Sequence, residues 1–175
     1  STENLTNLIW CDKIIAEIIS GEKKLMVTVK KVTTKKEIKT FVNFPNVLYA
    51  DDPLFVPATY SDDLGDWNKK KNPAFEYCDA EAFLAYKDGK VVGRIAAILS
   101  RRANKTWGYN RLRFSQVDFI DDEEVSAALF KAVEDYAKEK GCEAIHGPLG
   151  FSDMDREGML VDGFDKRNQF FTYYN

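Results

Sequence analysis

The first 25 residues carry an apolar stripe that fits one face of a helix. Its members recur at three- and four-residue spacing, and Gly21 supplies a C-terminal stop. They are Leu5, Leu8, Ile9, Ile15, Ile18 and Ile19. The stripe is too short and too often interrupted by charges to cross a bilayer. We therefore assign residues 1–25 to an N-terminal amphipathic helical extension, which packs either on its own domain or against a second subunit.

Residues 26–80 combine a strand, a helix and a long connection. The pattern at 27–32 predicts a short strand, and Thr34 with Glu37 three positions later forms a capping box that opens a helix. We expect this helix to end at about Phe44, because Pro45 lacks a backbone N–H. Prolines, paired aspartates and a lysine run then predict a long connection over residues 50–80, with one or two short turns.

Two strands follow in a hairpin. Residues 81–86 and 90–99 flank Asp88-Gly89, which favours a type I′ turn. The second strand is apolar on both faces except at Arg94, so we expect it inside a sheet that is covered on both sides. Residues 101–110 are expected to form a polar loop.

The strand expected over residues 111–120 changes phase in its middle. Its apolar residues stand at positions 112 and 114 and then at 117 and 119. In a regular strand this slip would turn the second half away from the core. We therefore predict a β-bulge within one residue of Ser115-Gln116, with Phe114 and Val117 both directed to apolar surroundings.

The last third of the chain begins with a second amphipathic helix. Its apolar face starts at Val125, after the acidic run Asp121–Glu124, and Gly141 marks its end. Residues 143–148 predict a short strand. The remainder, with mixed polarity and three glycines after position 149, is expected to hold a short helix and loops.

Composition and charge argue against several classes of function. The chain has 175 residues, 45% of them hydrophobic, which suits one globular domain, and its formal net charge of −3 argues against a nucleic-acid partner. Three widely spaced cysteines and a single histidine argue against a structural zinc site, so no metal is expected. The same cysteine pattern favours reduced thiols, which are typical of a cytoplasmic protein.

Four segments, taken in order, resemble the GNAT acyltransferase superfamily, and within it a bacterial subfamily of long GNAT-like proteins. They are "FVNFPNVLYADDPLFVP", "NPAFEYCDAEAFLAYKDGKVVGRIAAI", "DFIDDEEVSAALFKAVEDYAKEKG" and "GPLGFSDMDREGMLVDGFD". The resemblance covers residues 26–175 and leaves out residues 1–25. It implies an α/β fold and transfer of an acyl group from a coenzyme A thioester, such as acetyl-CoA, to a small-molecule or peptide amine.

The resemblance also implies where the donor lies. In this superfamily the fourth and fifth strands splay apart, the pantetheine arm lies between them, and a bulge in the fourth strand turns backbone N–H groups toward the thioester carbonyl. The bulge inferred at Ser115-Gln116 falls on that strand. By this resemblance Gln116, Val117, Phe119 and Ser126 are the candidate cofactor-binding residues.

Two features depart from the family pattern. The family's glycine-rich pyrophosphate loop is replaced by Asp121–Glu124, whose carboxylates favour a helix N-terminus but repel a pyrophosphate. The last two strands of the family's sheet have no clear counterpart in the sequence. We therefore expect a GNAT-like mixed sheet of about five strands with flanking helices, incomplete at its C-terminus.

An N-acyltransferase of this kind needs a base for the amine and an acid for the leaving thiolate. Asp118, beside the expected bulge, is a candidate base, or else a helix cap or surface charge. His146, at the end of the fifth strand, is a candidate for proton transfer, or else a hydrogen-bonded structural residue. Tyr173 is a candidate acid, or else a packing residue.

The sequence thus favours two functions. One is a GNAT-family N-acyltransferase with an unidentified amine acceptor. The alternative is a non-catalytic GNAT-like binding or dimerisation domain with a degenerate coenzyme A site. No membrane partner is expected. A homodimer is expected because the stripe of residues 1–25 and an open sheet edge both need cover, while a monomer results if the extension packs on its own sheet.

Overall fold

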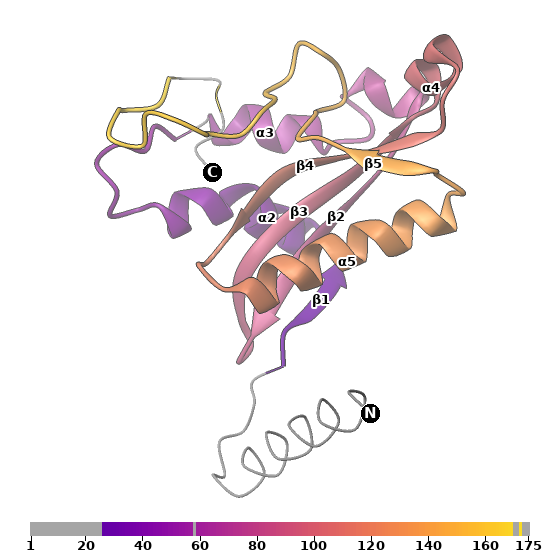
Figure 1. Cartoon of the computed structure of the whole chain (residues 1–175). Coiled ribbons are helices and arrows are strands. Elements are labelled where there is room, and N and C mark those ends of the chain that lie inside the picture. The colour runs from indigo at the N-terminus through magenta and orange to yellow at the C-terminus, as the bar shows by residue number, and fades with distance from the viewer. Residues whose placement is uncertain (1–25, 58, 170–171, 173–175) are drawn as a thin grey trace, which may run out of the picture.

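The computed structural model describes residues 26–57, 59–169 and 172, and these form a five-stranded mixed sheet with helices on both sides (Figure 1). The strands follow chain order across the sheet, and all pairs are antiparallel except β4 with β5. They are β1 (Thr28–Lys31), β2 (Cys78–Lys87), β3 (Lys90–Ser100), β4 (Arg111–Phe119) and β5 (Ala144–His146). The helices are α2 (Lys35–Leu48), α3 (Tyr60–Asp66), the 3₁₀ turn η1 (Pro73–Glu76), α4 (Arg101–Trp107) and α5 (Glu123–Glu139). This confirms the predicted α/β architecture.

Two apolar cores lie on opposite faces of the sheet. On one face, Ile95, Ala97 and Leu99 of β3 pack with α5, and on the other, Ala96 and Ile98 pack in the core that α2 covers. The central strand is therefore buried on both faces, as its sequence predicts. The approach of α5 is so close that a Cβ on Gly93 would lie 2.9 Å from a Leu129 methyl carbon, so only glycine fits there.

The β2–β3 hairpin turns at the predicted residues. Asp88 and Gly89 have φ values of 52° and 72°, and positive φ at both central positions is what a type I′ turn requires. The turn leaves Lys87 and Lys90 paired at the end of the ladder. The hairpin fixes the register of the two longest strands.

Helix α2 begins as predicted but ends later. Thr34 and Glu37 form a capping box in which each side chain accepts the other's backbone N–H. The prediction of an end near Phe44 is wrong, because α2 continues through Pro45 to Leu48. Pro45 cannot donate to the carbonyl of Phe41, and the Arg94 guanidinium donates to that oxygen instead, at 2.9 Å. A tertiary contact replaces the missing helical hydrogen bond.

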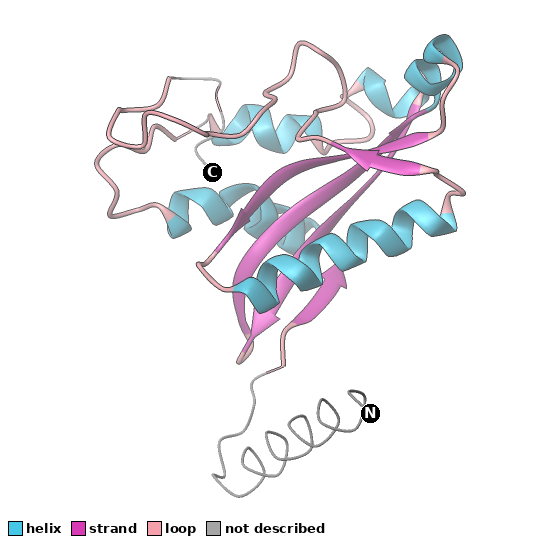
Figure 2. Cartoon of the chain, in the orientation of Figure 1, coloured by secondary structure: helices cyan, strands magenta, loops and turns pink. Residues whose placement is uncertain are grey.

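Two local expectations near the C-terminal half are also wrong (Figure 2). Residues 101–107, expected as loop, form α4, with the Ser100 side chain capping its start and Gly108 ending it in a left-handed conformation. The short helix expected after residue 149 is absent from the described part of that stretch. There, long-range backbone bonds such as Asn168 N–H to the Leu54 carbonyl hold the chain in extended loops.

The predicted helix within residues 1–25, and the domain boundary after it, lie outside the described residues. In the described part of the chain, none of the helices combines the length and apolar character needed to cross a bilayer.

Candidate active site

The centre of the candidate site is a β-bulge in β4. Ala96 pairs with Ser115 and Arg94 pairs with Asp118, so two steps along β3 face three steps along β4. The extra residue falls at Gln116, whose φ of 46° lies in the left-handed region. Such a conformation is uncommon for a residue with a Cβ and marks a constrained position.

The bulge is where the sequence predicts it, and its consequence for the side chains is confirmed. Val117 is buried in the core under α5, and Phe114 packs against the same core. The extra residue therefore restores the inward direction that the phase change would otherwise have lost.

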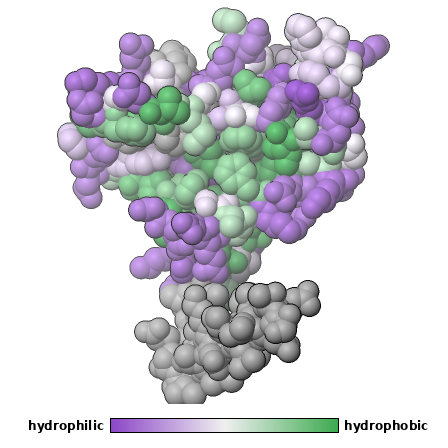
Figure 3. Space-filling view, viewed as in Figure 1, coloured by the Kyte–Doolittle hydropathy of each residue, from purple (hydrophilic) through white to green (hydrophobic). Residues whose placement is uncertain are grey.

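Strands β4 and β5 part just before the bulge. Their parallel pairing joins only Arg111–Arg113 to Ala144–His146, and beyond it Leu149 N–H donates to the Phe114 carbonyl. Residues 147–169, which we call the C-terminal segment, then cross toward α3 (Figure 1). Apolar side chains gather on the surface over β4, between α5 and this segment (Figure 3). The partly buried residues that pack against the neighbouring core include Phe114, Phe119, Phe130 and Ile145.

A cavity of about 190 Å³ adjoins the bulge, and we call it the bulge cavity. Ser115 and Gln116 form one wall, α3 forms a second with its aspartates, and the C-terminal segment closes it. Its acidic and basic lining residues are Asp62, Asp63, Asp66, Asp155 and Arg156. Four carboxyl groups against one guanidinium make this cavity suited to a cationic ligand.

Two carboxyl groups of the bulge cavity have raised pKa values. Partial loss of water raises the pKa of Asp66 to about 6, and repulsion from the carboxylates of Asp155 and Asp63 adds to the effect. Burial raises the pKa of Asp63, although the ion pair with Arg156 opposes it. With a pKa of about 6, Asp66 can change its protonation state near neutral pH.

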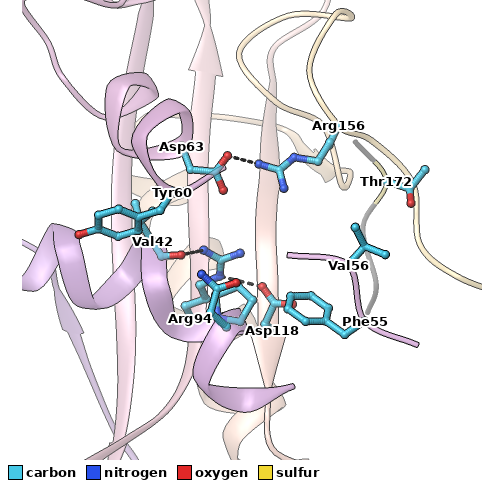
Figure 4. Close-up of a pocket in the computed structure, with 11 residues that line it drawn as sticks. Val42, Phe55, Val56, Tyr60, Asp63, Arg94, Asp118, Arg156 and Thr172 are labelled. Carbon is cyan, nitrogen blue, oxygen red and sulfur yellow. Dashed lines mark hydrogen bonds and ion pairs between the residues drawn. The ribbon is translucent and has the colours of Figure 1, made fainter. Parts of the chain in front are cut away.

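Asp118 lies on the other side of the bulge, at a narrower cavity of about 30 Å³ (Figure 4). Its carboxylate is 4% exposed and accepts from Arg94 Nε at 2.7 Å and from the Tyr49 hydroxyl at 3.1 Å. The Arg94 side chain extends from β3 to α2, where its guanidinium donates to the buried Phe41 carbonyl. Asp63 and Arg156 face Arg94 and Asp118 across the cavity, so the cavity lies between two ion pairs.

The N-terminus of α5 is occupied by its own side chains. Asp122 caps the helix by accepting the Glu124 N–H, and its carboxylate also accepts from Lys87 at 2.7 Å. That hydrogen bond lowers the pKa of Asp122 and raises the pKa of Lys87. Ser126 donates its hydroxyl to the Glu123 carbonyl at 3.0 Å. These residues do not fit a pyrophosphate, because carboxylates stand where N–H groups would have to meet phosphate oxygens.

The remaining predicted residues are dispersed. His146 pairs with Arg113, at the opposite end of β4 from Asp118, about 15 Å away at the rise of a strand. Burial lowers the pKa of His146, with the charges of Arg113 and Arg111 adding to the effect, which favours a neutral imidazole. Tyr173 lies outside the described residues. The fold thus brings Gln116, Val117 and Phe119 together on β4 and separates His146 from Asp118.

Sequence reasoning missed the residues that face the bulge from other elements. Asp63 belongs to the aspartate pair 62–63 of the long connection, and Asp66 follows three positions later, so the acidic character of residues 62–66 is the signal that could have found them. Trp67, which donates its indole N–H to Gln116 Oε1 at 2.9 Å, has no local signal at all. Its role depends on a contact across 49 positions of sequence.

Two curated proteins are similar to this chain in sequence. The chain matches no protein-family model. It is 34% identical over 137 residues to Protein YghO of Escherichia coli (strain K12), and 33% identical over 135 residues to Bacterial ceramide synthase of Caulobacter vibrioides. These matches cover 78% and 77% of this chain but 35% of each relative, so the chain spans about a third of their length.

A solved structure shows the fold. An aminoglycoside acetyltransferase from an uncultured soil metagenomic sample, in complex with sisomicin, superposes with a TM-score of 0.50 at 12% identity. The match covers 69% of this chain and 76% of that one. The described residues therefore have a GNAT-like fold.

Proposed function

We propose that this chain forms the donor-binding part of an N-acyltransferase that moves an acyl group from a coenzyme A-type thioester to an amine. The observation that carries the proposal is the bulge at Gln116, at the point where β4 and β5 part. In a GNAT-like fold this is the place where a thioester carbonyl meets the strand. Gln116 and Val117 then contact the thioester, and the partly exposed Phe119 contacts the arm of the donor.

The reaction is aminolysis. The amine nitrogen attacks the thioester carbonyl carbon, the C–S bond breaks, the thiolate leaves, and the nitrogen loses a proton. Asp66 lines the same cavity as Gln116, and its pKa of about 6 suits a group that accepts this proton near neutral pH. Asp118, with its oxygens bound by Arg94 and Tyr49, serves to hold β4 in place. His146 stands too far along β4 for the same step.

The donor fits this chain at its thioester end rather than at its nucleotide end. The apolar surface over β4 suits a pantetheine arm and an acyl chain, whereas Asp122 occupies the α5 terminus that would hold a pyrophosphate. The likeness to Bacterial ceramide synthase favours a fatty acyl group and a long-chain amine over an acetyl group and a small amine. A ceramide is the amide of a fatty acid with a long-chain amino alcohol, so the chemistry is the same.

The test is acyl transfer itself. Acetyl-CoA and palmitoyl-CoA are each mixed with the protein and with a short or a long-chain amino alcohol, and the released thiol and the amide are measured. We expect thiol and amide in equal amounts, and a thermal shift with the donor, since a thousandfold excess over Kd stabilises a fold by about 4 kcal/mol. The absence of both thiol release and a thermal shift at millimolar donor would refute the proposal.

A deletion of Gln116 provides a matched variant. It makes the β3–β4 ladder regular and leaves the pairing of Arg94 with Asp118 intact, while Gln116→Ala keeps the extra residue and removes only its side chain. We expect the deletion to abolish transfer and the alanine variant to retain part of it. Full activity without the extra residue would show that the bulge has no part in the reaction.

The carboxylates at the start of α5 favour the second candidate, a non-catalytic GNAT-like domain that binds or assembles without transferring an acyl group. Binding of donor without thiol release would select this function. The homodimer and the cytoplasmic location stay predictions, and light scattering at micromolar concentration tests the first.

A further inference from the structure

We propose that Trp67 is a positioning residue that holds the bulge of β4 in its working conformation through Gln116. The inference rests on the proposed function, because it concerns the residue that meets the thioester. Its basis is one hydrogen bond: the indole N–H of Trp67 donates to Gln116 Oε1 at 2.9 Å. An indole nitrogen can only donate, so the oxygen of the Gln116 amide must face it.

Gln116 needs such a partner because its backbone is constrained. Outside glycine, the described residues contain two positive φ values, and the other is Asp88 in the hairpin turn, where the turn type demands it. Gln116 lies inside a strand, where nothing in the local sequence supports a left-handed conformation. A residue held this way persists only when its surroundings determine it, and such residues cluster at functional sites.

Trp67 can impose this conformation because it is itself fixed. It is 9% exposed and follows α3 directly, as the C-cap residue. Its ring packs edge-on against Phe41 of α2, with centroids 5.2 Å apart, and against Phe151 of the C-terminal segment, at 5.9 Å. Three separate parts of the fold therefore determine the direction in which the indole N–H points.

The same contact ties the two walls of the bulge cavity together. Trp67 directly follows Asp66, the proposed proton acceptor, while Gln116 lies on the opposite wall. The bond therefore sets the distance between the group that takes the proton and the strand that meets the thioester. Because a displacement of about 1 Å can slow an oriented reaction up to about a hundredfold, loss of the bond is expected to reduce kcat more than it raises KM.

The variants isolate the hydrogen bond from the packing. Trp67→Phe keeps an aromatic ring between Phe41 and Phe151 and removes the donor, whereas Gln116→Met keeps the length of the side chain and removes the acceptor. The matched control is Trp107→Phe in α4, whose side chain is 72% exposed and lies outside the site. Each single variant is compared with Trp67→Phe/Gln116→Met in the thiol-release assay with palmitoyl-CoA and a long-chain amino alcohol.

We expect each single variant to lose about tenfold in kcat with KM for palmitoyl-CoA within about twofold, and the double variant to be no slower than either. Trp107→Phe should match the wild type. Losses that multiply in the double variant, or an unchanged kcat in Trp67→Phe, would overturn the inference.

A second measurement does not depend on turnover. The ¹³Cα and ¹³Cβ chemical shifts of Gln116 report its left-handed backbone, and in Trp67→Phe they should move toward values of an extended strand, while Trp107→Phe leaves them unchanged. If the wild type releases no thiol, the proposed function fails, and these shifts still decide whether Trp67 holds the bulge. Unchanged shifts in Trp67→Phe refute that role.

Discussion

Breaking the buried pair of Arg94 and Asp118 should be among the most damaging single changes in the described part of the molecule. Both side chains are at most 4% exposed, and they join β3 to β4 directly beside the bulge. Removing one partner leaves the other charged group buried without its ion-pair partner. The perturbations are Asp118→Asn and Arg94→Met, with Arg94→Met/Asp118→Leu as the combined replacement.

The magnitudes follow from the contacts that remain. Loss of one member of a buried pair costs about 3–5 kcal/mol. In Asp118→Asn the amide oxygen can still accept from Arg94, and the guanidinium keeps the Phe41 carbonyl, so we expect about 3 kcal/mol. In Arg94→Met the Asp118 carboxylate loses its counter-ion and keeps the Tyr49 hydroxyl, while the Phe41 carbonyl loses the Arg94 donor, so we expect about 5 kcal/mol. The double variant removes both charges and should lie within about 2 kcal/mol of the wild type.

Urea unfolding at 25 °C measures these differences. With a slope of about 2 kcal/mol/M, a loss of 3 kcal/mol moves the midpoint by about 1.5 M. The matched control is Asp79→Asn, which breaks the exposed pair with Arg101 and should cost about 1 kcal/mol or less. If Asp118→Asn cost no more than Asp79→Asn, or if the double variant were the least stable, the electrostatic reasoning would be refuted.

Three further predictions concern packing and pH. Gly93→Ala should cost about 1–3 kcal/mol in urea unfolding, because its Cβ would lie 2.9 Å from a Leu129 carbon, whereas Gly65→Ala, with open space around it, should cost nothing. Asp66→Asn should stabilise the protein at pH 8 and have no effect at pH 3, because a folded-state pKa raised from 3.8 to about 6 removes stability as pH rises through that range. The pKa shift sets an upper limit of about 3 kcal/mol on this stabilisation, and we expect about 1 kcal/mol because the carboxyl group is partly exposed to solvent. His146→Gln should remove part of the acid sensitivity in thermal melts between pH 7 and pH 5, since a lowered pKa makes protonation of His146 unfavourable in the folded state and costs stability as pH falls.

Features set by neighbouring residues were predictable from the sequence. The hairpin at Asp88-Gly89 follows from the turn residues, and the capping box follows from Thr34 and Glu37. The bulge at Gln116 was predictable for a related reason: the side-chain period of a strand is two, so one displaced apolar residue signals one inserted residue. The helix α4 was predictable in principle from Ser100, but its polar composition outweighed that cap.

Features set by distant contacts were not predictable in this way. Pro45 stops a helix by every local rule, and only the guanidinium of Arg94, 53 positions away, explains why α2 continues. The location of Asp118 was predictable but its partners were not, because a carboxylate on a strand looks the same in sequence whether it faces water or an arginine. For the same reason nothing in the sequence connects Trp67 with Gln116.

The helix that continues through Pro45 has a consequence for how this protein can change by mutation. Pro45 opens an acceptor at the Phe41 carbonyl, Arg94 occupies it, and Asp118 balances the charge of Arg94. A lineage that first lost Arg94 would keep Pro45, which leaves the Phe41 carbonyl without its donor, and Asp118, which would lack its counter-ion. Positions 45, 94 and 118 should therefore vary together among homologues, and paired substitutions should be tolerated where each single step is not.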